Sequence, residues 1–165
     1  MDTQKKVFVF TDGACKNNGS KTALGGVGVF WGHDDPRNVS CRVIVPGVTN
    51  NICELLAIQT ALQTILPLVF SVDPDVASDC KYVVVSDSKY AISSLTTWYA
   101  GFVRREWKTV AGTNIKNRAL IFSTREILDT LGNRVSLQHV KAHSGNPGNE
   151  AADALAVAGC FCSAC

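Results

Sequence analysis

Long apolar stretches are missing from this chain of 165 residues, since no uninterrupted apolar run approaches the roughly 20 residues of a membrane-spanning helix. The first six residues, MDTQKK, are polar and have no apolar segment of the kind found in signal peptides. We therefore expect no membrane association and a location in the cytoplasm or the nucleus. An even, regularly spaced cysteine framework is also missing, because the seven cysteines are odd in number and scattered. Reduced thiols are expected.

A strong excess of charge of one sign is lacking as well. The formal net charge is +2, and 46% hydrophobic with 18% charged residues is ordinary for one globular domain. Residues 98–118 nevertheless carry a local charge of +4, because five basic residues stand there against Glu106 alone. Such a patch indicates a polyanion such as nucleic acid, although a solvated helix face is the commoner origin of a charge run. The basic residues are Arg104, Arg105, Lys108, Lys116 and Arg118.

The order of periodic segments predicts an α/β fold. Alternating and β-branched runs predict strands over 7–11, 25–31, 40–45, 82–86 and 135–140, and helical spacing predicts helices over 52–66, 88–97, 116–131 and 149–158. Pro67 is expected to help end the first helix. The first three strands would form an antiparallel meander, and the strand over 82–86 would pair with the first in parallel. With no internal repeat or linker, we expect one domain over 1–159 and a Cys-rich tail over 160–165.

Four carboxylates stand where a strand ends or a helix begins or runs: Asp12, Glu54, Asp87 and Asp153. Each has a simple structural explanation, because Asp-Gly is a turn dipeptide, Asn51 and Glu54 have the spacing of a capping box, and Asp87 precedes a helix that it could cap. Asp153 could be an exposed helical acid. Taken together they favour another interpretation, since the carboxyl ends of parallel neighbouring strands face one crevice. Clustered carboxylates repel one another unless cations such as Mg²⁺ neutralise them.

Five segments together resemble the motifs of type 1 ribonuclease H, in its eukaryotic-like form. They are FTDGACKNNG, NNICELLA, VVVSDSKY, WKT followed by NIKN, and VKAHSGNPGNEAADALA. The resemblance covers residues 7–159 and keeps the family's order and spacing. It implies a ribonuclease H-like fold, with a mixed five-stranded sheet flanked by helices. It also implies an endoribonuclease that hydrolyses the RNA strand of RNA/DNA hybrids, leaving a 5′-phosphate and a 3′-hydroxyl.

The resemblance assigns catalytic roles to five residues. Asp12, Glu54 and Asp87 would hold one Mg²⁺ ion at the scissile phosphate, while Asp12 and Asp153 would hold a second that activates water. Mn²⁺ would substitute for Mg²⁺. His143 matches a mobile histidine that assists proton transfer or product release. His33 and His139 match no catalytic position and are expected to be structural.

The resemblance also assigns residues that bind the hybrid. Asn18, Asn50 and Asn51 would contact it near its bases or sugars, and Thr49 and Asn117 would belong to a pocket for a DNA phosphate. Trp98 and Phe102 would line the channel for the DNA strand, although core packing is a serious alternative for this pair. Four basic residues would track phosphates and make binding sensitive to salt. These are Arg104, Arg105, Lys108 and Lys116.

Some features depart from the family pattern. Val48 stands where a phosphate-binding arginine is expected, so we expect a weaker phosphate pocket. No separate hybrid-binding module precedes the first strand, so we expect lower affinity and processivity than in family members that have one. We also expect a monomeric protein. Cys160, Cys162 and Cys165 suggest zinc only weakly, since a fourth ligand is lacking. Two alternative functions stay open: the ribonuclease H domain of a reverse transcriptase, and a non-catalytic nucleic-acid-binding module.

Overall fold

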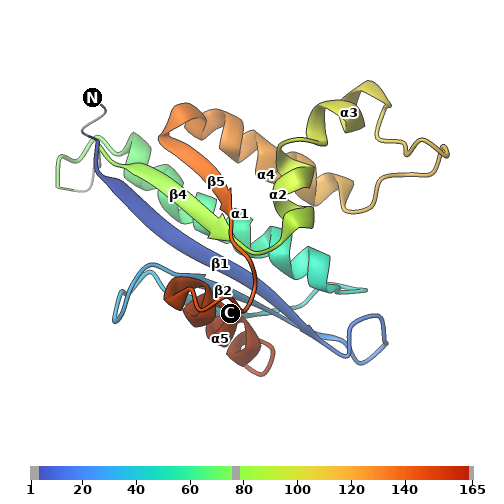
Figure 1. Ribbon diagram of the computed structural model, residues 1–165, viewed down its shortest axis with the longest axis horizontal. Helices are drawn as coiled ribbons and strands as arrows, with labels where there is room; N and C mark the ends of the chain where they lie inside the picture. The colour runs from blue at the N-terminus through green and yellow to red at the C-terminus, as the bar shows by residue number, and fades with distance from the viewer. Residues whose placement is uncertain (1–3, 76–78, 164–165) are drawn as a thin grey trace.

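A mixed sheet between two layers of helices forms the body of the protein (Figure 1). The computed structural model describes residues 4–75 and 79–163. The strands are β1 (Lys6–Lys16), β2 (Leu24–Phe30), β3 (Val39–Val43), β4 (Lys81–Ser86) and β5 (Val135–His139). The helices are α1 (Asn50–Phe70), α2 (Lys89–Leu95), α3 (Tyr99–Arg104), α4 (Arg118–Leu131) and α5 (Pro147–Gly159), with a short 3₁₀ turn, η1 (Gly132–Arg134), before β5.

The five strands lie in the order β3-β2-β1-β4-β5. The pairs β1 with β2 and β2 with β3 are antiparallel, whereas β1 with β4 and β4 with β5 are parallel, which confirms the predicted mixed sheet. In the parallel pair Thr11 lies beside Ser86. Asp12 and Asp87 each come one residue later in the chain. The register therefore places these two carboxylates where the parallel pairing of β1 and β4 ends. The predicted end of the first strand at residue 11 is wrong, since β1 continues to Lys16 by pairing with β2, so Asp12 lies inside the strand.

The core lies between the sheet and the layer formed by α1 and α4. Leu55, Ile58 and Leu62 of α1 are fully buried in it. By length and composition alone α1 could also cross a membrane, because an 18-residue window has a mean hydropathy of 1.6. Much of that window, 44%, is buried inside the domain, as in the core helix of a globular protein. The contacts of α1 with β1, β2 and α4 account for its apolar composition.

The predicted end of the first helix near Pro67 is wrong, since α1 continues through Pro67 to Phe70. Proline removes one backbone hydrogen bond to the residue four positions earlier, which is Gln63. Gln63 is exposed, so water can satisfy its carbonyl oxygen. The loss of one bond in the last turns is offset by the packing of the helix on the sheet.

The segment after β4 also differs from the prediction. The helix expected over 88–97 ends at Leu95, and a second helix, α3, follows it without having been predicted. At six residues α3 is too short to show helical periodicity in the sequence. Aromatic contacts hold it, because the ring of Phe102 lies 6.4 Å from that of Trp98 and 5.8 Å from that of Trp107.

Helix α5 covers the opposite face of the sheet from α1 and packs closely on β2 (Figure 1). A methyl group at Gly28 would lie 2.1 Å from the carbonyl oxygen of Ala152, and one at Gly26 would lie 2.2 Å from that of Ala156. Both distances are far below van der Waals contact. The two glycines therefore allow the backbone of α5 to lie directly on β2, which sets the distance between this helix and the sheet.

The expectation of reduced thiols holds for five cysteines, since the sulfurs of Cys15, Cys53, Cys80, Cys160 and Cys162 form no disulfide. It is wrong for Cys41, which is disulfide-bonded. Spacing along the chain does not reveal which cysteines meet in space. In the predicted tail, Cys160 is fully buried against α5 and β1, whereas Cys165 lies outside the described residues. The division between residues 1–159 and the tail stays a prediction.

Gly28→Ala is expected to destabilise the protein by about 2–3 kcal/mol, because the new methyl group meets backbone atoms that cannot rotate away. Urea unfolding followed by circular dichroism measures the change. Gly101→Ala is the control, since a methyl group there meets only the flexible guanidinium group of Arg105 and alanine favours a helix. Equal stability of the two variants would contradict the inference that Gly28 is needed for the close packing of α5 on β2.

Candidate active site

Three of the predicted carboxylates come together where the parallel pairing of β1 and β4 ends. Asp12, Glu54 and Asp87 each offer one oxygen, and these three oxygens lie within 4.8 Å of one another. They come from three different elements, since Asp12 lies in β1, Glu54 in the second turn of α1, and Asp87 directly after β4. Asp12 and Glu54 are only 5% exposed, and Asp87 is partly buried. The fold therefore concentrates negative charge in a small, mostly buried volume.

None of these acids has the structural role that single motifs suggested. Thr49 caps α1, because its hydroxyl oxygen accepts a hydrogen bond from the backbone N–H of Ile52. Ser88 caps α2 in the same way, accepting from the N–H of Ala91. Asp12 lies inside β1 and not in a turn. The capping-box and turn interpretations are thus wrong, because neighbouring residues already supply the caps.

Gly13 ties two of the carboxylates together. Its backbone N–H donates to Oδ1 of Asp12 at 2.8 Å and to Oε2 of Glu54 at 3.1 Å. A methyl group at Gly13 would lie 2.3 Å from the backbone nitrogen of Glu54, so only glycine lets β1 approach α1 this closely. The Asp-Gly pair therefore serves close packing between a strand and a helix, which brings the two acids together.

Burial and mutual repulsion disfavour the ionised forms of Asp12 and Glu54. Desolvation, followed by the charges of Asp12 and Asp87, raises the pKa of Glu54 well above its ordinary value. Desolvation, followed by the charges of Asp87 and Asp153, raises the pKa of Asp12. No described residue forms a salt bridge with the three clustered acids. Such a site suits a cation, which removes both the repulsion and the desolvation penalty.

The other two predicted catalytic residues, Asp153 and His143, lie outside the group of three carboxylates. Asp153 is a partly buried residue of α5, and its charge contributes to the raised pKa of Asp12. Its oxygens do not belong to the group of three oxygens within 4.8 Å. His143 is exposed in the loop between β5 and α5, with a left-handed backbone conformation (φ 51°). The side chain of His143 is therefore accessible to solvent.

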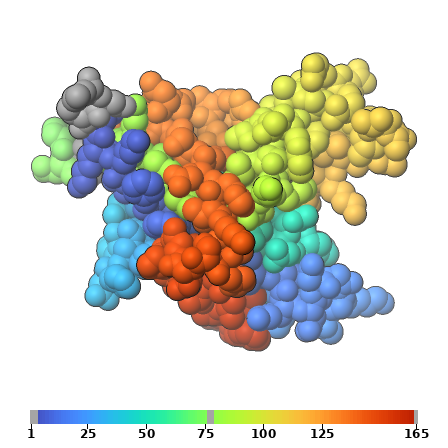
Figure 2. All heavy atoms as spheres, in the orientation of Figure 1, coloured from blue at the N-terminus to red at the C-terminus, as the bar shows by residue number. Residues whose placement is uncertain are grey.

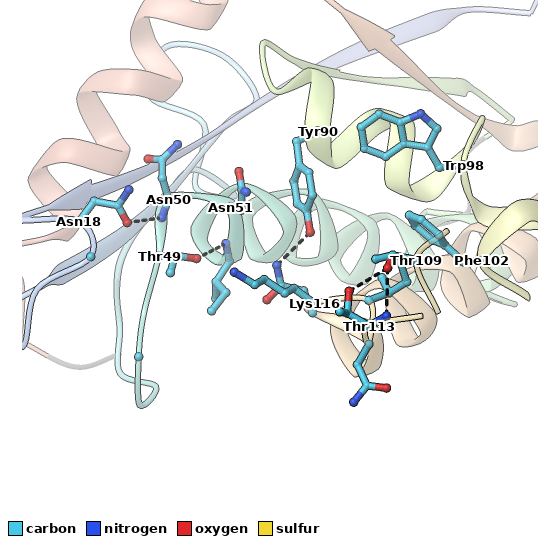
Figure 3. Close-up of a pocket in the computed structure, with 16 residues that line it drawn as sticks. Asn18, Thr49, Asn50, Asn51, Tyr90, Trp98, Phe102, Thr109, Thr113 and Lys116 are labelled. Atoms are coloured by element: carbon cyan, nitrogen blue, oxygen red, sulfur yellow. Dashed lines mark hydrogen bonds between the residues drawn. The ribbon is translucent and has the colours of Figure 1, made fainter. Parts of the chain in front are cut away.

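A groove beside the acids holds most of the residues predicted to bind substrate. Figure 2 shows a hollow between the turn after β1 and the protruding segment after α3, with the start of α1 at its floor. A cavity of about 890 Å³ lies in this region, and Figure 3 shows its lining. The predicted residues that line it are Asn18, Thr49, Asn50, Asn51, Trp98, Phe102, Lys116 and Asn117.

Tyr90 is a residue of this cavity that sequence reasoning missed. Its hydroxyl oxygen accepts a hydrogen bond from Nδ2 of Asn117 at 2.9 Å, and its ring lies 6.3 Å from that of Trp98 (Figure 3). The signal was present in the sequence, because Tyr90 follows Asp87 by three residues within a quoted motif. Thr109, Thr113 and Asn114 also line the cavity and were not predicted.

The aromatic pair divides its roles between core and surface. Trp98 is 45% exposed, whereas Phe102 is 8% exposed and packs in the core cluster. Core packing, the alternative considered for the pair, thus accounts for most of Phe102 and little of Trp98. Val48 is likewise a core residue, 7% exposed among Val27, Val43 and Cys53. It cannot offer a polar group to the cavity.

The predicted basic residues follow the same side of the molecule. Arg104 and Arg105 line a second cavity of about 400 Å³ together with Trp98 and Phe102. Lys108 donates to the side-chain oxygen of Asn114 within the protruding loop. The three are exposed, as is Lys116 in the first cavity. These exposed cationic groups therefore lie in and next to the groove, where they could attract a polyanion.

Comparisons with known proteins agree with this geometry. The family model described as RNase H matches residues 4–161. A protein named Ribonuclease H from Schizosaccharomyces pombe is 38% identical over 148 residues, which are 90% of this chain and 50% of that protein. A Ribonuclease H from Alcanivorax borkumensis is 35% identical, over 92% of this chain and 89% of its own. The chain thus spans about half the length of the eukaryotic relatives it matches and most of the bacterial ones.

Solved structures show the same fold. LC9-RNase H1, described as a type 1 RNase H with the type 2 active-site motif, superposes with a TM-score of 0.66 and 28% identity, over 93% of this chain and 71% of that one. A foamy viral protease-reverse transcriptase in complex with an RNA/DNA hybrid matches with a TM-score of 0.70 and 16% identity, over 94% of this chain and 20% of that one, which supports the fold alone. From the family match, the relatives and the fold, the chain belongs to the RNase H family, among the type 1 members.

Proposed function

We propose that this protein is an endoribonuclease that hydrolyses the RNA strand of RNA/DNA hybrids by two-metal-ion catalysis, leaving a 5′-phosphate and a 3′-hydroxyl. The observation that carries the proposal is the convergence of three carboxylates from β1, α1 and β4 with no described cationic partner. The names of its relatives support the same reaction. That all four acids of the family are present favours an enzyme over a non-catalytic binding module.

The donor set fits divalent ions with a preference for oxygen. Asp12, Glu54 and Asp87 would hold one ion, and Asp12 with Asp153 would hold the other, with Mg²⁺ as the proposed ion and Mn²⁺ as a substitute. When bound, the two ions supply Lewis acidity at the phosphate and a reactive water. The residues hold this site rigidly, because the Gly13 N–H fixes two of the carboxylates. His143, on its exposed loop, would assist proton transfer or product release.

The groove supplies the positioning of the hybrid. We assign Asn18, Asn50 and Asn51 to contacts near bases or sugars, because they line the cavity next to the first turn of α1. Nδ2 of Asn117 is held by the hydroxyl of Tyr90. Lys116 and Asn117 are adjacent in the lining of the cavity, so we assign these two residues to its phosphate-binding side. The exposed indole of Trp98 offers a stacking surface for the DNA strand. Arg104, Arg105 and Lys108 would track phosphates beyond it.

Three further expectations belong to the same proposal. Val48 leaves the phosphate pocket without the expected arginine, so binding there depends on Thr49, Lys116 and Asn117. The hydroxyl of Thr49 already caps α1, which limits it to an accepting or bifurcated role. A monomeric state and a location in the cytoplasm or nucleus stay predictions.

Asp87→Asn is expected to leave the fold intact and to reduce Mg²⁺-dependent cleavage of a hybrid about 10³-fold or more. Loss of one charged ligand removes several kcal/mol of transition-state stabilisation, and each 1.4 kcal/mol is about tenfold in rate. The measurement uses end-labelled RNA/DNA hybrid, duplex RNA and single-stranded RNA, with and without Mg²⁺. Retained activity in a pure preparation of the variant would refute the site, and cutting of duplex RNA would refute the substrate class.

Glu54→Gln is expected to stabilise the metal-free protein, increasingly as the pH rises. The pKa of Glu54 is raised in the fold, so above about pH 4.3, the ordinary glutamate value, the unfolded chain loses a proton that the folded chain retains. The free energy of unfolding of the wild type therefore falls with rising pH relative to the variant. Urea unfolding at pH 5 and pH 8 in EDTA tests this. A difference between the two proteins that does not change with pH would contradict it.

Lys116→Ala is expected to weaken hybrid binding and to lower the slope of log Kd against log salt by about 1, as for the loss of one phosphate contact. Fluorescence anisotropy in the cleavage-deficient Asp87→Asn background measures both quantities. Lys5→Ala removes an equal charge at the amino-terminal end of β1 and serves as the control. If the two lysine variants behave alike, the effect reflects net charge and not the groove.

A further inference from the structure

Asn149 contacts the acid cluster, although no role has been assigned to it so far. It belongs to the first turns of α5 and is only 4% exposed. It precedes Asp153 by four residues, so both side chains lie on the same face of the helix. Its Nδ2 donates a hydrogen bond of 3.2 Å to Oδ2 of Asp87. Helix α5 therefore reaches the cluster through two side chains, an acid and an amide.

The amide of Asn149 is retained at a cost to the fold. Its Oδ1 is buried, and no described residue donates a hydrogen bond to it. An unpaired buried amide oxygen is unfavourable, and alanine at this helical position would avoid the penalty. Turning the amide over would place Oδ1 against the carboxylate of Asp87, where two acceptors repel. The orientation is thus fixed by the one contact that Nδ2 makes with Asp87.

Asp87 has few other neighbours that could fix its side chain. Asp12 and Glu54 share the backbone N–H of Gly13, whereas Asn149 is the donor to the carboxylate of Asp87 among the described residues. The imidazole Nε2 of His139 lies 3.2 Å from the backbone carbonyl oxygen of Asp87 and so holds the main chain and not the carboxylate. Both donors to the cluster are neutral, so neither brings a positive charge that would compete with a bound cation.

We propose that Asn149 is a positioning residue that orients the carboxylate of Asp87 for metal binding, by donating Nδ2 to one oxygen and leaving the other directed at the ion. This inference rests on the proposed function, since it concerns a ligand of the same site. It assigns to α5 two tasks, because Asp153 supplies a ligand and Asn149 orients one from β4. Loss of an outer hydrogen bond of this kind typically lowers metal affinity about 10- to 100-fold.

The test is a Mg²⁺ titration of the full ¹⁵N-labelled chain, in which the amide resonance of Gly13 reports binding at the cluster. Asn149→Ala and the bulkier Asn149→Leu both remove the donor, and both are expected to weaken Mg²⁺ binding about tenfold or more. In hybrid cleavage at fixed Mg²⁺ the variants should lower kcat with KM for the hybrid within about twofold, because Asn149 does not line the groove.

Asn146→Ala is the matched control. The side chain of Asn146 caps α5 by accepting from the N–H of Asn149, so its loss weakens the same helix without removing the donor to Asp87. It should leave Mg²⁺ affinity within about twofold of the wild type. If Asn146→Ala reproduces the loss, or if both Asn149 variants bind Mg²⁺ like the wild type, the positioning role is wrong.

A readout that needs no metal separates this inference from the proposed function. A wild-type protein that neither binds Mg²⁺ nor cuts the hybrid would refute the function. The contact itself is then judged by the side-chain NH₂ resonances of Asn149 in the metal-free protein, which should shift in Asp87→Ala. Unchanged Asn149 resonances in that variant would overturn the positioning role, whatever the metal does.

Discussion

Mutual repulsion among closely spaced carboxylates is the constraint on which the arrangement of this protein depends. Three acids that would avoid one another in solution are held within 4.8 Å because β1 and β4 pair in parallel and α1 packs against β1. The folded state therefore carries an electrostatic penalty, visible in the raised pKa values of Asp12 and Glu54. The core formed by α1, α4 and the sheet must be stable enough to offset that penalty in the metal-free protein.

Close backbone approach is how the fold brings the acids together. Gly13 lets β1 lie against the start of α1, and Gly26 and Gly28 let α5 lie on β2. Without these contacts, Glu54 on one face of the sheet and Asp153 on the other would be too far from Asp12. Helix α5 also carries Asn149, whose amide donates a hydrogen bond to Asp87 while its own buried oxygen is without a described hydrogen-bond donor. The positions of the acids therefore depend directly on how closely the helices pack on the sheet.

Several residues proposed to bind the hybrid also stabilise the fold. Thr49 caps α1 and lines the cavity, Phe102 packs in the core beneath it, and Asn117 is held by the hydroxyl of Tyr90. Their side chains are already ordered by the fold, which would lower the entropy cost of the proposed binding. Trp98 and the basic residues of the protruding segment are, by contrast, largely exposed, and their contacts lie within or next to that segment.

The sequence by itself determined the order of strands and long helices and the four acids, because hydrophobic periodicity and strand-end positions are local properties of the chain. It did not reveal α3, the passage of α1 through Pro67 or the true caps Thr49 and Ser88, which depend on neighbours that supply packing or an alternative donor. The tertiary structure brings Asp12, Glu54 and Asp87 together, as their strand and helix positions and the family resemblance predicted. Only the tertiary structure decided that Phe102 is mainly core while Trp98 is exposed, and that Asn149 touches Asp87. These facts join residues tens of positions apart, and no local pattern encodes distances of that kind.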